Sequence, residues 1–178
     1  MDKPEKKQRI VSLAHLVSEN AAELSEVEYG LIVAGNAFGH WVVRGMAAAA
    51  ADFPVAADLG MIDVYCLHSV NHHARAKRLA DICFKLNIGD THIISYALKK
   101  LAAADLVSST KQGKEVFYET TETGKALCLR YREVRETCLI DGFSSLGTVD
   151  AKSLSELARQ LRTLSGLYDQ AARSATHL

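Results

Sequence analysis

Residues 78–119 constrain the fold of this chain more than any other segment. They read RLADICFKLN, then DTHIISYALKKLAAADLV, then SSTKQGKEVFYE. The first two stretches have apolar side chains at helical spacing and are separated by a short turn, which predicts two helices. In the third stretch, apolar and polar residues alternate after a central glycine, which is typical of a β-hairpin. This order predicts a helix-turn-helix with a hairpin wing behind it, an arrangement that fits a helix into the major groove of duplex DNA.

The charge of the chain is distributed unevenly. Its 21 basic and 21 acidic residues cancel, and a neutral chain by itself argues against a nucleic-acid-binding protein. The segment from Arg75 to Lys114, however, contains eight basic residues and only three acidic ones. Phosphate contacts require such a local excess rather than a basic protein overall, and the excess lies on the helix-turn-helix segment.

Apolar spacing predicts further helices on both sides of this segment, and capping residues mark their ends. The helices at the two ends are too apolar for a small monomer, which favours a homodimer built from them. The predicted fold is mainly α with a small β-hairpin wing. Its parts are N-terminal dimerisation helices (1–58), a winged helix-turn-helix (59–120) and C-terminal dimerisation helices (121–178). Helices are expected at about Arg9–Glu19, Glu26–Ala50 behind a Ser25–Glu28 capping box, 59–72, 76–86, 90–104, 122–139 and 153–172.

The helix over 90–104 is the predicted recognition helix, with Asp90 as its cap. Its buried stripe includes Ile94, Leu98 and Leu101, and a solvated helix face is the simpler interpretation of the opposite side. The functional interpretation is that this side meets DNA, because its hydroxyls and imidazole can bond bases or phosphates and its lysine can neutralise a phosphate. Tyr96 could instead pack under the wing. The candidate DNA-binding residues of this helix are Thr91, His92, Ser95, Tyr96 and Lys99.

The hairpin tip offers Lys111, Gln112 and Lys114 around Gly113, which is expected to adopt a positive φ. The tip is either an exposed turn kept soluble by lysines or a contact to the DNA backbone at the minor groove. Before the third helix, Arg75 is a further candidate for a phosphate contact, together with Lys77 and Arg78. Ordinary surface charge explains these three equally well.

Few features support catalysis or metal binding. His68 and His72 are four residues apart on a predicted helix, but no glutamate follows His68 and no other ligand stands at a suitable spacing. A polar helix end is the favoured interpretation, without a metal. No nucleophile, dinucleotide or phosphate-loop motif is present, so neither an enzyme nor a cofactor is expected. The sequence shows no membrane span and no secretory signal, which predicts a cytoplasmic protein without a membrane partner.

Four cysteines, Cys66, Cys83, Cys128 and Cys138, are present without any C-x-x-C pair. Reduced, partly buried thiols are the ordinary expectation in the cytoplasm. Cys128 and Cys138 are ten positions apart on one predicted helix, about 15 Å along its axis, which is too far for a bridge within that helix. A redox switch that bridges two subunits stays open as the alternative.

The segments RLADICFKLNIGDTHIISYALKKLAAADLV and KQGKEVFYETTETGKAL resemble winged-helix transcription regulators of the MarR type, from about Leu59 to Leu127. SEVEYGLIVAGNAF, LHSVNHHARAKRLADIC and RYREVRETCL look like a bacterial branch of that family. The resemblance implies a homodimer on double-stranded DNA, with His92, Ser95, Tyr96 and Lys99 in the major groove and the 111–114 turn beside it. It also implies a crevice for a small, often aromatic, effector. The family wing commonly holds an acidic residue followed by paired arginines, and this short wing has none, which argues against insertion into the minor groove.

The favoured function is therefore a dimeric, sequence-specific DNA-binding regulator of transcription, most simply a repressor, with possible control by a small aromatic ligand or by oxidation. The main alternative is a winged helix that contacts protein instead of DNA. The third interpretation is a sensor that binds a ligand or a metal, the metal at His68 and His72, and does not itself recognise a DNA sequence.

Overall fold

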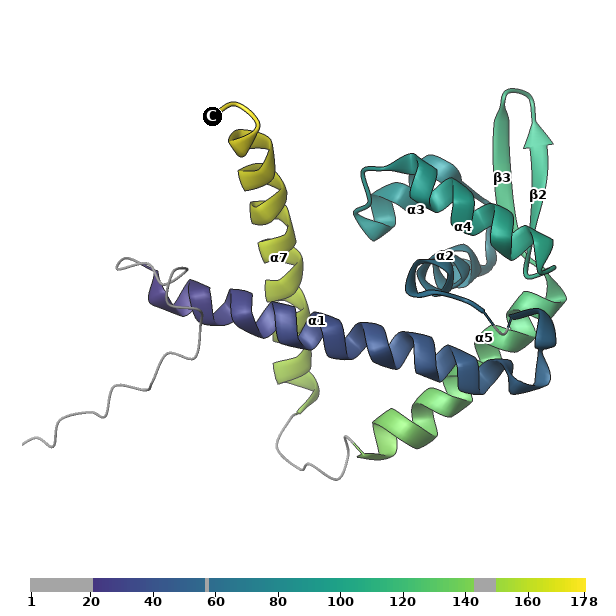
Figure 1. Ribbon diagram of the computed structural model, residues 1–178, viewed down its shortest axis with the longest axis horizontal. Helices are drawn as coiled ribbons and strands as arrows, with labels where there is room; N and C mark the ends of the chain where they lie inside the picture. Colours follow the sequence, from purple (N-terminus) through teal and green to yellow (C-terminus); the bar gives the residue numbers. More distant parts are fainter. Residues whose placement is uncertain (1–20, 57, 143–149) are drawn as a thin grey trace, which may run out of the picture. The chain divides into compact units, whose positions relative to one another are not determined.

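The computed structural model describes residues 21–56, 58–142 and 150–178 (Figure 1). The chain forms two compact units, the first ending at Arg135 and the second beginning at Glu136. The first unit contains the helix-turn-helix and the wing, and the second contains one long helix. The helix predicted over Arg9–Glu19 lies outside the described residues.

Helix α1 spans Ala22–Ala49 and begins earlier than the sequence predicts. Ser25 was expected to cap this helix, but it lies inside the helix and is only 2% exposed. The predicted Ser25–Glu28 capping box is therefore wrong, because the good helix formers before Ser25 extend the helix by a turn. The C-terminal half of α1 carries its core contacts, through Val42, Met46 and Ala49.

Three helices make the centre of the first unit. Two short 3-10 turns (Ala50–Asp52 and Pro54–Ala56) lead to α2 (Met61–Asn71), and α3 (Leu79–Leu86) and α4 (Thr91–Ala103) follow. Asn87 ends α3 in a left-handed conformation with φ 54°, and the Asp90 carboxylate accepts the backbone N–H of His92 at 2.8 Å. The predicted turn and the predicted cap of the recognition helix are confirmed.

A three-stranded antiparallel sheet completes the winged unit, in the order β1-β3-β2. Strands β2 (Val107–Gln112) and β3 (Glu115–Thr120) form the predicted hairpin, and Gly113 takes φ 62° at its tip. Strand β1 (Lys77–Arg78) was not predicted. The helix expected from Ala76 begins only at Leu79, because residues 77 and 78 pair with Tyr118 and Phe117 of β3.

Helix α5 (Glu122–Arg135) packs against α1 and α2 in the first unit. It is capped by the Thr121 hydroxyl, which accepts the Gly124 N–H at 3.0 Å. A π-helical turn, Glu136–Ile140, follows it, so the α-helix predicted to reach residue 139 ends earlier. The core of the first unit gathers apolar side chains from α1, α2, α3, α4, β2 and α5, with Leu67, Ile82, Leu98 and Leu127 fully buried.

Helix α7 (Ala151–Ala175) makes up most of the second unit. The Asp150 carboxylate caps it by accepting the Ser153 N–H at 2.7 Å. One side of α7 carries a row of exposed leucines: Leu154, Leu157, Leu161 and Leu167. Among the described residues, no helix is both long and apolar enough to cross a bilayer.

Candidate nucleic-acid interface

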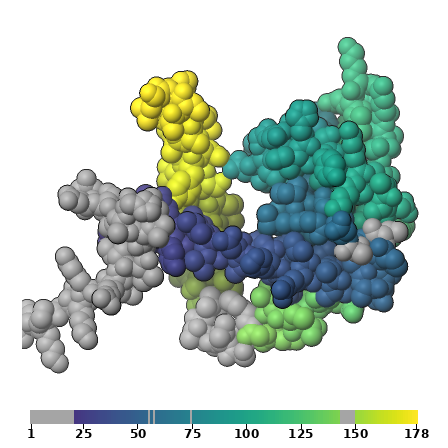
Figure 2. Space-filling view, viewed as in Figure 1, coloured from purple at the N-terminus to yellow at the C-terminus, as the bar shows by residue number. Residues whose placement is uncertain are grey.

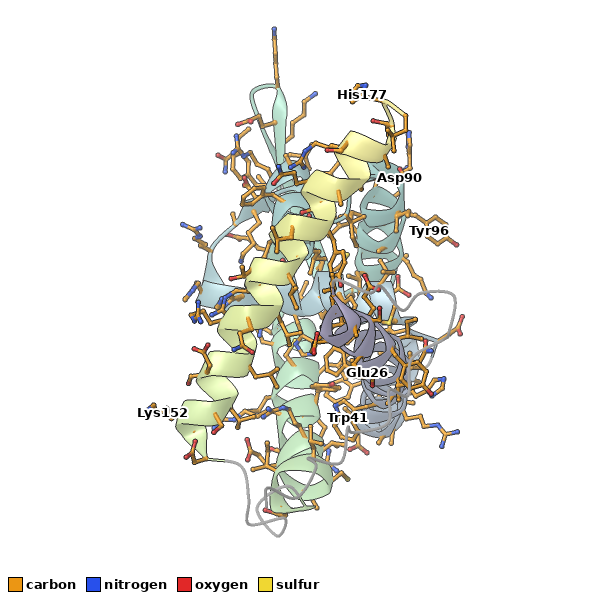
Figure 3. The ribbon with its side chains drawn as sticks, turned by 90° about the vertical axis from the view of Figure 1, so that its left-hand side faces the viewer. Glu26, Trp41, Asp90, Tyr96, Lys152 and His177 are labelled. Carbon is orange, nitrogen blue, oxygen red and sulfur yellow. The ribbon has the colours of Figure 1, made fainter. Side chains whose placement is uncertain are left out.

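Helix α4 has a buried side and an open side. Ile94, Ala97, Leu98 and Leu101 are buried against the rest of the first unit. Among the candidate residues, Thr91, His92, Tyr96 and Lys99 are exposed and Ser95 is half-buried. Tyr96 is 72% exposed and points away from the helix into open space, so it does not pack under the wing (Figure 3). The polar side of α4 is thus open to solvent over most of its length.

The open side of α4 is held in place by an ion pair at its C-terminal half. The Lys100 ammonium lies 2.8 Å from the Asp63 carboxylate and also donates to the Asp58 carbonyl. The same Asp63 oxygen accepts the N–H of Gly60 at 2.9 Å, which caps α2. The hydrogen bond from Lys100 to Asp63 raises the pKa of Lys100. Lys99 is therefore the lysine of α4 that stays open to a phosphate.

The wing places its polar tip well beyond the core. Lys111, Gln112 and Lys114 are all exposed, and the hairpin stands out from the first unit as a narrow projection (Figure 2). Glu115 pairs with Gln112 next to the turn, so the tip also carries one acidic residue. Two exposed lysines on a narrow hairpin can reach a phosphate backbone, but the hairpin lacks an arginine for a narrow groove.

The three basic residues before α3 have different roles. Arg75 is exposed, as a phosphate contact requires. Lys77 is only 7% exposed, and its ammonium donates to the carbonyls of Val70 at 2.7 Å, His72 at 2.5 Å and Arg75 at 3.1 Å. The prediction that Lys77 clamps a flanking phosphate is therefore wrong, because its charge is used inside the protein to close the C-terminal end of α2.

Arg78 joins the start of α3 to the part of β3 that lies next to the hairpin turn. Its guanidinium contacts Asp81 at 3.0 Å and Glu115 at 2.9 Å. The hydrogen bonds from Arg78 lower the pKa of the Asp81 carboxyl and in turn raise the pKa of Arg78. Three of the five guanidinium N–H groups are bound to these two carboxylates, so Arg78 holds α3 to β3 and much of its charge is balanced there.

A hollow of about 480 Å³ is lined by residues of α2 and α3 and contains none of the candidate DNA-binding residues. Tyr65, Lys85 and Leu86 line it, and two buried polar atoms beside them, Ser69 Oγ and His68 Nε2, have no hydrogen-bond partner. Burial lowers the pKa of His68, so its ring is neutral near pH 7. No motif in the sequence indicates this hollow, because Ser69 and Lys85 lie on separate helices and no local spacing connects them.

The two histidines singled out in the sequence, His68 in α2 and His72 directly after it, lie in different surroundings. His68 lies against Tyr131 with ring centroids 4.8 Å apart, whereas His72 stacks on His73 at 3.8 Å. Across the described ranges 21–56, 58–142 and 150–178, no three His, Cys, Asp or Glu residues gather as metal ligands would. The two imidazoles therefore have different environments.

The cysteines also differ. Cys66, Cys83 and Cys128 are buried, while Cys138 is exposed in the second unit. Burial raises the pKa of both Cys66 and Cys128 to about 12, so these two thiols are protonated and poorly reactive. Of the pair singled out in the sequence, only Cys138 is open to an oxidant.

Comparison with known proteins agrees with this geometry. The winged helix DNA-binding domain family matches residues 59–124, which contain α2, α3, α4 and the wing. The solved MarR family regulator NMB1585 from Neisseria meningitidis is similar over 85% of this chain and 97% of its own, at 17% identity and a TM-score of 0.63. The chain has the MarR-type winged-helix fold.

Two further structures share the MarR-type fold at 17% identity. The transcriptional regulator BldR from Sulfolobus solfataricus covers 83% of this chain and 96% of its own, with a TM-score of 0.59. A MepR-like protein complexed with pseudoligands covers 88% and 97%, with a TM-score of 0.58. No curated protein matches in sequence. At these identities the likeness concerns the fold, and the role of each residue must come from its own geometry.

Proposed function

We propose that the protein is a dimeric, sequence-specific DNA-binding regulator of transcription and that it acts as a repressor by occupying a two-fold site. The observation that carries this proposal is the open polar side of α4, which combines hydroxyls, an imidazole and Lys99 on a firmly seated helix. Repression follows most simply because a dimer bound over a promoter blocks the polymerase.

In the proposed complex, the N-terminal half of α4 enters the major groove. Thr91, His92, Ser95 and Tyr96 face base edges and nearby phosphates, and Lys99 neutralises a phosphate. Arg75 and the wing tip, with Lys111, Gln112 and Lys114, contact the backbone on either side. Because the wing carries lysines instead of arginines, its contribution is mainly electrostatic and depends little on sequence.

The dimer is proposed from the apolar surface that the described residues leave exposed. Ile32, Val33 and Phe38 of α1 are at least half exposed, and α7 exposes its row of leucines. Apolar side chains exposed in such numbers on two helices favour an interface with another copy. A second copy would cover them and would supply the two-fold symmetry of a palindromic operator.

The experiment that tests the function is recovery of duplex sites from a random library by the full chain, followed by affinity measurement at several salt concentrations. We expect an inverted repeat whose half-sites are about one helical turn apart. We also expect log K to fall linearly with log salt concentration, with a slope that counts the phosphate contacts. Absence of any selected sequence would instead favour a winged helix that contacts protein.

A small aromatic ligand is the proposed modulator, and the hollow lined by Tyr65, Lys85 and Leu86 is its candidate site. Tyr65 and Leu86 offer it an aromatic ring and an aliphatic side chain, and Lys85 can meet an anionic group, so the hollow fits an aromatic acid. A ligand weakens DNA binding only if it binds the free form more tightly than the DNA-bound form. Titration of aromatic acids against the operator complex tests this, with oxidant and reductant as a parallel comparison for Cys138.

A further inference from the structure

Helix α4 exposes two large apolar side chains beside its polar ones. Ile93 is 44% exposed and Tyr96 is 72% exposed, and because they are three residues apart they lie on neighbouring parts of one side. Ile62 and Ala97 adjoin them around a shallow hollow of about 440 Å³, which His92 also borders. Figure 3 shows the Tyr96 ring projecting away from the helix. The proposed recognition surface is thus partly apolar.

The same helix lacks the side chains that most often read purines and cytosine. Residues 91–103 contain no arginine, asparagine, glutamine, aspartate or glutamate. Those residues make the paired hydrogen bonds to guanine and adenine or accept a bond from cytosine. Lys100, the second lysine of α4, is already bound to Asp63. His92 and Lys99 are the two residues of α4 that could still read guanine strongly.

The apolar group that a protein meets in the major groove is the 5-methyl of thymine. The charge around Ile93 and Tyr96 indicates whether DNA or an apolar protein surface covers them. No residue of α4 is acidic, and the one carboxylate that borders the hollow, Asp63, is paired with Lys100. Lys99 lies about one turn beyond Tyr96, and the wing adds Lys111 and Lys114. A polyanion is therefore drawn to this side, and its thymine methyls are the groups that can cover Ile93 and Tyr96.

We propose that Ile93 and Tyr96 determine sequence specificity by packing against thymine methyl groups, so that each operator half-site carries thymine opposite the N-terminal half of α4. The inference rests on the proposed DNA-binding function and adds the chemistry of its base reading. Polar residues on the same face, His92 and Ser95, then supply affinity and orientation more than discrimination among bases.

The test uses duplex sites selected by the full chain and replaces their thymines one at a time by deoxyuridine, which lacks only the methyl group. At the positions read by α4 we expect binding to weaken about fourfold per methyl, the loss for one buried methyl-sized group. Ile93→Ala and Tyr96→Ala should each remove part of this discrimination. Tyr96→Phe, which keeps the ring, and Ser95→Ala should leave it unchanged.

The possible results test thymine recognition and DNA binding separately. If the selected sites bind tightly but deoxyuridine is tolerated everywhere, or if Ile93→Ala and Tyr96→Ala keep the full discrimination, thymine reading is refuted while DNA binding stands. Guanine discrimination that disappears with His92→Ala or Lys99→Met would also overturn it. If the chain selects no duplex, the proposed function fails as well.

Discussion

At the scale of single residues, Gly124 is the position with the least room for a side chain. A Cβ there would lie 2.1 Å from the backbone oxygen of Leu106, which cannot move without shifting the start of β2. We expect Gly124→Ala to lower the free energy of unfolding by about 3 kcal/mol, as overpacking at a rigid contact does. Urea unfolding measures this. Gly89→Ala, where the added carbon meets nothing within 4 Å, is the matched control and should be nearly neutral.

Lys99 and Lys100 are adjacent lysines with opposite expected roles. Lys99→Met should weaken DNA binding and reduce the salt slope by about one, because one phosphate contact is lost. Lys100→Met should leave the slope unchanged and lower stability, because it leaves the Asp63 carboxylate, which is mostly buried, without its partner. Affinity against salt concentration and thermal unfolding, measured on both variants, distinguish the two. Equal salt slopes for wild type and Lys99→Met would contradict the placement of Lys99 on DNA.

His68 makes stability depend on pH. Burial lowers the pKa of its ring below 6.5, so below that pH the unfolded chain takes up a proton that the folded chain does not. This contribution to stability is complete above about pH 6.5 and declines as the pH falls toward the lower, folded pKa. We expect unfolding free energies measured from pH 7.5 to 5 to fall more steeply for the wild type than for His68→Gln. Parallel curves would show that His68 does not carry the effect.

At the scale of elements, the end of α2 depends on one buried cation. The Lys77 ammonium donates to three carbonyls at and after the end of α2, and its bond to the Val70 carbonyl is buried. Lys77→Met keeps the aliphatic stem and removes the donors, and we expect a loss of about 2–4 kcal/mol. Thermal unfolding followed by circular dichroism checks this. Arg75→Met is the control, since its side chain is exposed, and should change stability by less than about 0.5 kcal/mol.

Elements with strong local signals could be predicted from the sequence. Asp90 and Gly113 each satisfy a local requirement of a cap or a turn, so α4 and the wing could be placed correctly. Elements that depend on distant partners could not be predicted. Strand β1 exists because β3 passes beside it, nearly forty residues later, and nothing in its two residues indicates that pairing.

The candidate site follows the same division. The outward face of α4 could be read from helical spacing, because burial of Ile94 and Leu98 fixes which side faces out. Helical spacing does not show whether a lysine is available to a phosphate or is already bound within the protein. Lys77, Lys99 and Lys100 are alike in the sequence, and only their surroundings show that the first closes a helix, the second is open and the third holds α4 to α2.

The assembly of two copies can be tested at the exposed leucine row of α7. Leu157→Glu and Leu161→Glu place charges in the exposed leucine row of α7, and we expect each to shift the protein toward monomer in light scattering. DNA affinity should fall with it, because one winged unit covers a single half-site. Gln160→Glu adds the same charge at a polar position on α7 and should leave the mass unchanged. A monomeric wild type with full operator affinity would contradict the proposed dimer.

The length of α1 has a mechanical consequence. Its 28 residues form a rod of about 42 Å, seated in the core near one end by Val42, Met46 and Ala49. A tilt of about 10° at that seat displaces the opposite end by about 7 Å, simply because the rod is long. In the proposed dimer, the two winged units must lie about one turn of duplex apart. A small rearrangement beside α2 that tilts α1 would therefore change this separation enough to weaken DNA binding.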